Sequence, residues 1–215
     1  DSYSRAVLQF VPRARSAARD AHECPGLLFA GSIGPEGMYA NHVGDMGQKK
    51  NALYSATVFA RRWLTTRDVT SLDADFGTAS TLYTMMRETV EFWMCYLRWN
   101  PKKQRYDDVN DCVGELCSDG PMQVHVNPTF TLSALRFVMG ALIDAANTTG
   151  RDAARRSDWR RVLCRLAPYP AASVGGSSVT VAREGSTSVD ATSPLFPGGF
   201  CPAAAAACDG DPPYE

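Results

Sequence analysis

The chain has 215 residues, 45% of them hydrophobic, and its 22 Lys and Arg residues nearly balance 23 Asp and Glu residues, for a formal net charge of -1. A chain of this length can bury a sizeable core, so we expect one large globular domain or two small ones. The balanced charge, with no basic run to neutralise a row of phosphates, argues against a nucleic-acid partner, and no uninterrupted apolar stretch reaches the roughly 18 to 20 residues of a membrane span.

Apolar residues recur at the three- and four-residue spacing of amphipathic helices in five segments. The first segment stops at Cys24-Pro25-Gly26 and the last at Pro168 and Pro170, while Asn127-Pro128 has the composition of an N-cap followed by a first-turn proline. The predicted helices cover residues 3–23, 48–65, 82–99, 129–147 and 152–166.

The composition changes after the last predicted helix. Residues 174–189 are rich in Ser, Gly and Val, alternate around Val179 and Val181 and carry a turn signal at Glu184-Gly185, which predicts a short β-hairpin within a hairpin and loop region over 172–215. Long helices joined by alternating short and long loops indicate an all-α fold of stacked antiparallel helical hairpins. A bundle, a solenoid and an α/α toroid all fit, although no fixed-period repeat supports a solenoid.

The chain has seven cysteines, which is a high number for a reduced cytosolic protein of this size. Two pairs are close in sequence, Cys112 with Cys117 and Cys201 with Cys208, so we expect an oxidising compartment. The sequon Asn147-Thr148-Thr149 agrees with secretion. The odd seventh cysteine is expected to be free or to bridge to another chain.

Metal binding is not indicated, because no CxxC pair occurs and His22, His42 and His125 are scattered. We therefore predict no metal site and no cofactor. The sequence starts at Asp1 without a signal-like segment, so we expect either a mature form or a piece of a longer protein.

Three acids lie close together between two predicted helices, in the loop over residues 110–120: Asp111, Glu115 and Asp119. Acidic loops between helices are usually only solvated, so the loop alone does not predict catalysis.

Several short motifs, none of them specific alone, follow one another along most of the chain. In this order they resemble the six-hairpin, (α/α)6-barrel glycoside hydrolases, in the inverting α-L-fucosidase-like group and its relatives. The motifs are Ala17–Ala21 with Pro25–Ala30, Gly34–Gly37, Gly47–Ala52, Asn127–Thr129 with the helix after it, Arg156–Pro170, Phe196–Gly199 and Asp209–Glu215.

The resemblance implies that residues 1–215 are part of one (α/α)6 glycosidase-like domain, the central portion of a toroid with a short β-hairpin insertion near its C-terminal end. A complete toroid needs about twelve helices, more than this chain provides. The remaining pieces of the domain would then lie on other polypeptide segments or on neighbouring chains.

The resemblance also assigns the catalytic acid. Glu115 takes its position, Asn110-Asp111 takes that of the Asn-Asp before it, and Gly114 stands where many relatives have His or Pro. Inversion needs a protonated carboxyl that donates to the leaving oxygen, and a second carboxylate roughly 6.5 to 9.5 Å away that activates water. Like charge from Asp111 and Asp119 would raise the pKa of Glu115 and suit it to donate.

A Cys112–Cys117 disulfide would hold Glu115 in a small closed loop and fix its direction. No second carboxylate is identified as the base, since Asp45 and Asp211 are suggested only by their placement in loops.

The predicted substrate-binding residues are His125, Trp93 and Asn110. Trp93, like Trp63, Trp99 and Tyr96, could stack on a sugar ring, but aromatics at helical spacing are more often core. His125 lies between the acid loop and Asn127, where it could face the cleft, although a histidine in such a place is more often on the surface or in the core.

Together these observations predict a secreted, extracellular or lumenal enzyme that cleaves a glycan with inversion, with Glu115 as general acid and Asp111 as a second catalytic residue. The alternative is a catalytically inactive carbohydrate-binding or structural subunit of an extracellular assembly, suggested by Gly114, the missing base and the extra cysteines. A third possibility, a helical scaffold unrelated to sugars, predicts that the loops over 31–47 and 110–120 are far apart.

Overall fold

The computed structural model describes residues 2–29, 49–78, 80–112, 125–174, 177–181 and 183–185. Within these residues α-helix dominates, and the strands form two-stranded antiparallel hairpins. The helices are α1 (Ser2–Leu8), α2 (Val11–His22), α3 (Asn51–Thr66), α4 (Val69–Leu72), α5 (Leu82–Tyr96), α6 (Thr129–Thr149) and α7 (Arg156–Cys164). The strands are β1 (Arg98–Asn100) with β2 (Arg105–Asp107), β3 (Val109–Asp111) with β4 (His125–Val126), and β5 (Ala171–Val174) with β6 (Ser177–Thr180).

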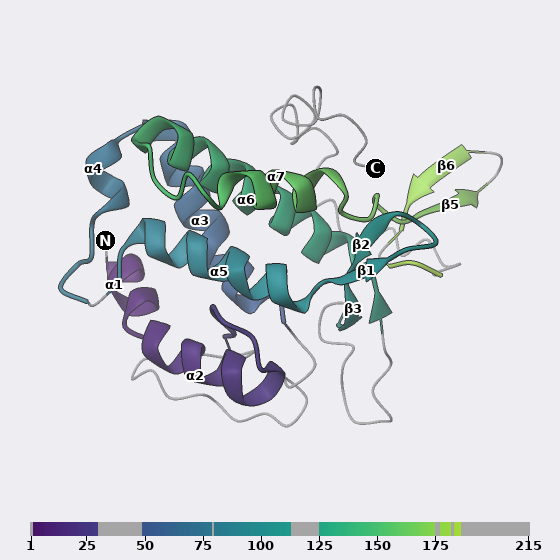
Figure 1. The fold of residues 1–215 in the computed structure, drawn as a ribbon, viewed down its shortest axis with the longest axis horizontal. Helices are drawn as coiled ribbons and strands as arrows, with labels where there is room; N and C mark the ends of the chain where they lie inside the picture. Colours follow the sequence, from purple (N-terminus) through teal and green to yellow (C-terminus); the bar gives the residue numbers. More distant parts are fainter. Residues whose placement is uncertain are drawn as a thin grey trace.

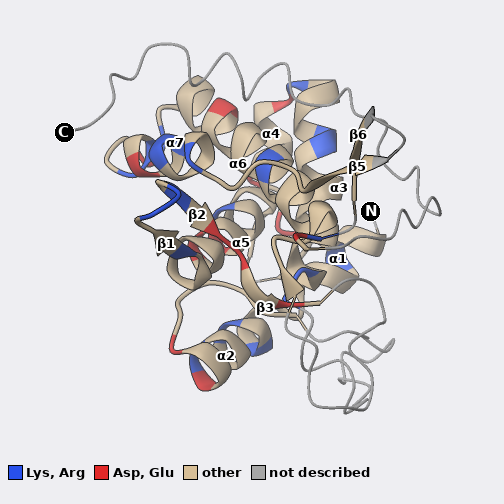
Figure 2. Ribbon diagram, turned by 90° about the vertical axis from the view of Figure 1, so that its right-hand side faces the viewer, with Lys and Arg blue, Asp and Glu red and all other residues tan. Residues whose placement is uncertain are grey.

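The helices lie in stacked layers, with α2 on one side of α5 and with α6 and α7 on the other (Figure 1). Helix α3 packs against both α5 and α6, and the strand hairpins gather at one end of the helices. The prediction of a mainly helical fold is therefore confirmed, while the helices described here do not close into a ring. Lys and Arg (blue) and Asp and Glu (red) are both scattered over the ribbon, as Figure 2 shows.

Helix α6 runs through the middle of the core. Among the described residues it is the one helix long and apolar enough to cross a membrane by length and composition, yet 61% of its most apolar window is buried inside the protein. As expected, charged residues interrupt this apolar stretch, at Arg136 and Asp144, although the mean hydropathy of the helix is still high enough for a span. Such a largely buried helix is typical of a globular core.

The first predicted helix is divided in two. Helix α1 ends at Leu8 and α2 begins at Val11, with Pro12 in the first turn of α2. Proline lacks a backbone N–H, and its ring clashes with the carbonyl four residues earlier, so a continuous helix is disfavoured here. The predicted stop is present, because Glu23 adopts the left-handed conformation at the end of α2.

Gly26 lets the chain after α2 approach α5 closely. At its φ of +92°, an added Cβ would lie 2.3 Å from the carbonyl oxygen of Glu88 and 2.5 Å from the nitrogen of Phe92. The next residue, Leu27, donates its N–H to the same Glu88 oxygen at 3.2 Å. Only glycine fits this contact without a shift of the backbone.

The predicted helix over 82–99 is too long. Helix α5 ends at Tyr96, and residues 98–100 turn back through Pro101–Gln104 to pair with β2. The Asn100-Pro101 dipeptide is a turn signal that helical spacing obscured. Similarly, α7 starts at Arg156 rather than at residue 152, after a turn in which Asp152 has a positive φ.

The C-terminal hairpin lies earlier than predicted. Strand β5 pairs with β6 so that Val174 is opposite Ser177, whereas Glu184-Gly185 forms a separate turn. The side chain of Glu184 forms ion pairs with Lys103 and Arg105 of the β1–β2 hairpin. A turn is therefore present at the predicted residues, but it does not connect the two strands of the hairpin. It places Glu184 in contact with the β1–β2 hairpin.

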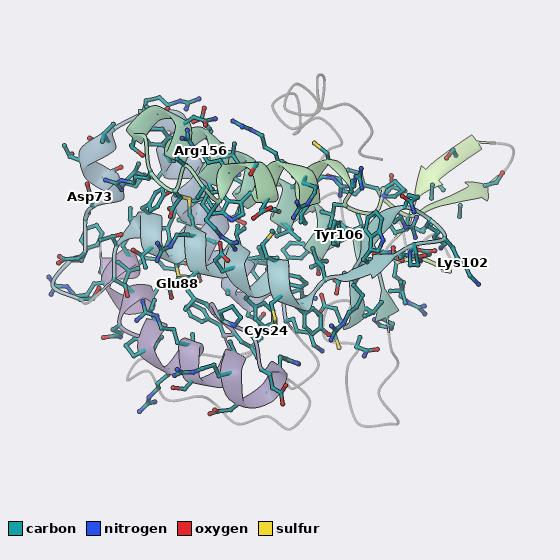
Figure 3. All side chains as sticks on the ribbon, viewed as in Figure 1. Cys24, Asp73, Glu88, Lys102, Tyr106 and Arg156 are labelled. Carbon is teal, nitrogen blue, oxygen red and sulfur yellow. A yellow bond between two sulfur atoms is a disulfide. The ribbon has the colours of Figure 1, made fainter. Side chains whose placement is uncertain are left out.

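A disulfide joins Cys24, just after α2, to Cys95 in α5, and the two Cα atoms are 5.7 Å apart (Figure 3). Cys112 and Cys164 are disulfide-bonded as well. The predicted partners Cys117, Cys201 and Cys208 lie outside the described residues. Disulfides are weakly suggestive of an oxidising compartment.

Replacing both Cys24 and Cys95 with serine should lower the free energy of unfolding by about 2–4 kcal/mol, because the bond closes a long loop in the unfolded chain. Urea unfolding of the two proteins under non-reducing conditions measures the loss. The double variant is preferable to a reductant, which would also attack the bonds of Cys112 and Cys164. An unchanged unfolding midpoint would contradict a stabilising role.

Candidate functional site

Polar and charged side chains gather in the interior where the β3–β4 hairpin meets the starts of α3 and α6. None of them is more than 6% exposed. We call this group the buried polar cluster; it consists of Lys49, Lys50, Tyr96, Asp108, Asp111, His125 and Thr131.

A β-bulge shapes the edge of the cluster. In the β3–β4 ladder Val109 pairs with Val126 and Asp111 pairs with His125, so Asn110 is the extra residue. Its φ of 60° lies in the left-handed region, which Asn tolerates better than most residues. The bulge turns Asp111 and His125 inward as a pair and leaves Asn110 exposed.

Asp111 is held through both carboxylate oxygens. Its Oδ1 accepts the backbone N–H of Lys49 at 3.1 Å, and its Oδ2 accepts the hydroxyl of Thr131 at 2.6 Å. These partners come from the entry to α3 and the first turn of α6, so one side chain links three parts of the fold.

The two lysines strengthen the same connection. Nζ of Lys50 donates to the carbonyl oxygen of Cys112 at 2.8 Å, and Nζ of Lys49 donates to the carbonyl oxygen of Asn110. Burial lowers the pKa of both lysines, and the negative charge of Asp111 partly offsets this effect. Residues 49–50 are thus bound to residues 110–112, about sixty positions away.

Asp108 is the residue that the sequence argument missed. It is completely buried, and among the described residues no N–H or hydroxyl group donates to either carboxyl oxygen, while the carboxyl of Asp111 lies near enough to accept its proton in a hydrogen bond. Burial raises its pKa well above the ordinary value, and the nearby charge of Asp111 acts in the same direction. Asp108 therefore keeps its proton under conditions in which an exposed aspartate would lose it.

Asn127 fixes the backbone of Asp108. Its Oδ1 accepts the N–H of Asp108 at 2.8 Å, and its own N–H donates to the Asp108 carbonyl oxygen at 2.8 Å. The prediction that Asn127 caps α6 is therefore wrong, since Pro128 is the N-cap residue and the Asn127 side chain is engaged elsewhere. An asparagine before proline can either cap a helix or bond a neighbouring strand, and the sequence contains no signal that separates these two roles.

One histidine, His125, belongs to the cluster, and a second, His22, adjoins it. Burial lowers the pKa of His125, the positive charge of Arg183 lowers it further, and Asp111 opposes them. The ring of His22, at the end of α2, packs edge-on against Tyr96 at 5.1 Å, and burial and then Lys49 lower its pKa. Both imidazoles are thus biased toward the neutral form.

Tyr96 connects the cluster to the aromatic core. Its hydroxyl donates to the carbonyl oxygen of Val109 at 2.7 Å, and burial raises its pKa. On its other side lie Phe92 and Trp93, with ring centroids 5.5 and 5.7 Å away.

The structure thus brings together three of the predicted site residues, Asp111, His125 and Asn110, in one hairpin. Trp93 is 0% exposed and belongs to the hydrophobic core, which does not favour stacking on a sugar. Glu115 lies outside the described residues, as do the other residues of its loop from 113 to 120.

The described ends of the two long loops touch. Lys49 follows the loop over 31–47 and binds Asn110 and Asp111, where the acid loop starts. The separation that a sugar-unrelated scaffold predicts is therefore not found at these ends.

An open hollow of about 450 Å³ lies at α1, α2 and residues 76–78, at the opposite end of the helices from β3 (Figure 1).

Comparison with known proteins finds no matching protein-family model and no matching curated protein.

Replacing Asp108 with asparagine should stabilise the protein at neutral pH. The folded-state pKa is raised above the unfolded value of about 3.9, so the favourable contribution of the acid is complete below about pH 4 and is lost as the pH rises toward the folded-state pKa. The gain should therefore grow between pH 4.5 and 7.5, by about 1.4 kcal/mol for each unit by which the two pKa values differ.

Asp107 provides the matched control for this measurement by urea unfolding. Burial alone would raise its pKa, but hydrogen bonds from Asn100 and Asn127 and the ion pair with Arg105 lower it overall. Asp107→Asn should therefore lose stability relative to the parent as the pH rises through the range below the unfolded value of about 3.9, and the loss should stay nearly constant above about pH 5. A difference between Asp108→Asn and the parent that is independent of pH would contradict a protonated Asp108.

Proposed function

We propose that the chain is part of an inverting (α/α)6 glycoside hydrolase in which Glu115 is the general acid. The observation that carries the proposal is the set of hydrogen bonds between Lys49, Lys50 and residues 110–112. These bonds join two motifs of the family resemblance, Gly47–Ala52 and the Asn-Asp that precedes the acid. Helices α3, α5, α6 and α7 would supply part of the toroid, and other segments or chains would complete it.

In this proposal Asp111 is a positioning residue. Both of its oxygens are occupied by Lys49 and Thr131, so it holds the start of the acid loop instead of contacting a sugar. The Lys50 bond to the Cys112 carbonyl, and the disulfide of Cys112, add further restraints three residues before Glu115. A catalytic carboxyl on a loop needs such support, because small errors in its position cost rate.

Asp108 has the protonation state of a general acid but not the access. It is 0% exposed, so a glycosidic oxygen could not reach it in this conformation. We therefore assign proton donation to Glu115 and keep Asp108 as a neutral neighbour that adds no second negative charge beside Asp111.

The alternative function is a non-catalytic carbohydrate-binding or structural subunit. One observation favours it: among the described residues, the two cluster carboxyls are unsuited to act as the base, since Asp111 has both oxygens occupied and Asp108 is fully buried. In that case the role of the cluster would be structural.

Incubation of the complete natural protein with a panel of fucosides, galactosides and glucosides tests the proposal, with proton NMR reading the anomer released. The expected result is release of a sugar with inverted configuration. Release with retained configuration would overturn the mechanism, and sugar binding without release would support the alternative.

A further inference from the structure

The sequon Asn147-Thr148-Thr149 plays no part in the proposed function, and the structure gives it a specific setting. It forms the end of α6, just before Gly150, whose φ of 73° ends the helix. Asn147 and Thr148 are exposed. No other Asn-x-Ser/Thr triplet of the chain is suited to glycosylation, since Asn127-Pro128-Thr129 has proline at the middle position and a buried Asn127.

The neighbouring helix orients the Asn147 amide. Nη1 of Arg156 and Nη2 of Arg160 donate to its Oδ1 at 2.9 and 3.1 Å. A guanidinium has donors only, so the oxygen must be the amide atom that faces α7. The nitrogen Nδ2 then lies on the side of the amide away from the two arginines, on an exposed residue.

We propose that Asn147 is a site of N-linked glycosylation. The co-reactant is a polyprenyl-diphosphate-linked oligosaccharide, presented by a transferase of the secretory pathway. A bond forms between Nδ2 and the anomeric carbon of the sugar, and the bond from that carbon to the diphosphate oxygen breaks. The polyprenyl diphosphate leaves with the bonding electron pair, and Nδ2 loses one proton.

Transfer precedes the completion of α6. In the folded helix the hydroxyl of Thr149 donates to the carbonyl oxygen of Ala145 at 2.7 Å, so it is engaged four residues back along the helix. The sequon hydroxyl becomes accessible to a transferase before that turn closes. Once the helix has formed, the amide oxygen can keep its two arginine bonds, because only Nδ2 carries the sugar.

The glycan would lie far from the buried polar cluster. Thr131 of the cluster is in the first turn of α6 and Asn147 is in its last turn. Sixteen residues at a rise of 1.5 Å separate them by about 24 Å. Arg156 accordingly lies near the end of the molecule away from the strand hairpins (Figure 3), so this inference does not depend on the proposed function.

Secretion of the chain from a eukaryotic host, followed by intact-mass measurement before and after an amidase that removes N-glycans, tests the proposal. The parent protein should carry one glycan, and peptide mapping after the amidase should show aspartate at position 147. Thr149→Ser keeps the sequon and should keep the glycan. Asn147→Gln and Thr149→Ala should both lack it.

Two results would overturn the inference: a secreted parent protein without sugar at Asn147, or a glycan that persists in Asn147→Gln. Asn147→Gln keeps an amide oxygen for the arginines, so it gives an answer even where Thr149→Ala fails to fold.

Discussion

Asp111→Ala should lower the free energy of unfolding by about 3–5 kcal/mol, the cost of removing one partner from a buried charged group. The substitution leaves the Lys49 N–H and the Thr131 hydroxyl without their acceptor, and both lysines lose a neighbouring negative charge in the interior. Urea unfolding at neutral pH provides the measurement, with the same dependence of the free energy of unfolding on urea concentration (m-value) used for both proteins.

Asp158 is the matched control, because it also contacts two cations, Arg155 and Arg161, but on the surface of α7. Exposed ion pairs contribute roughly 0–1 kcal/mol, so Asp158→Ala should cost far less. Equal losses in the two variants would mean that the cluster does not hold the hairpin to α3 and α6.

Glu115→Gln should lower glycan hydrolysis by about 10²–10⁴-fold, the usual contribution of a general acid. Glutamine has the shape of glutamate but no acidic proton, so substrate binding should change little. The loss should be much smaller on an aryl glycoside whose phenol is acidic, because that leaving group departs without protonation.

Initial rates of the parent and of Glu115→Gln, measured on a natural glycan and on the activated aryl glycoside, give the fold-loss on each substrate. Asp20→Asn, on the exposed side of α2, provides a variant of the same charge change that should leave both rates intact. An equal loss on both substrates would argue that Glu115 supports the fold or binding and does not donate the proton.

The helices were the most predictable part of the fold, because their apolar spacing depends on local sequence. α3 and α6 begin and end within a few residues of the prediction. Errors arose where a second local signal competed with that spacing, at Pro12 and at Asn100-Pro101. The toroid, in contrast, came only from the resemblance and stays a proposal.

The candidate site was predictable only in part. Asn110 and Asp111 were found through the resemblance, but Lys49, Lys50 and Asp108 read as ordinary charged residues in a sequence of balanced charge. Their burial results from contacts with residues about sixty positions away. A contact between residues so far apart leaves no pattern in the local sequence, so the raised pKa of Asp108 could not be predicted.

The bonds between Lys49, Lys50 and residues 110–112 also bear on the order of folding. Contacts of large sequence separation require closure of a long loop before they return any energy. The helical hairpins can form from local contacts, whereas the cluster needs α3, the β3–β4 hairpin and α6 already in place. We therefore expect the buried polar cluster to form after the apolar core, as the last step of folding.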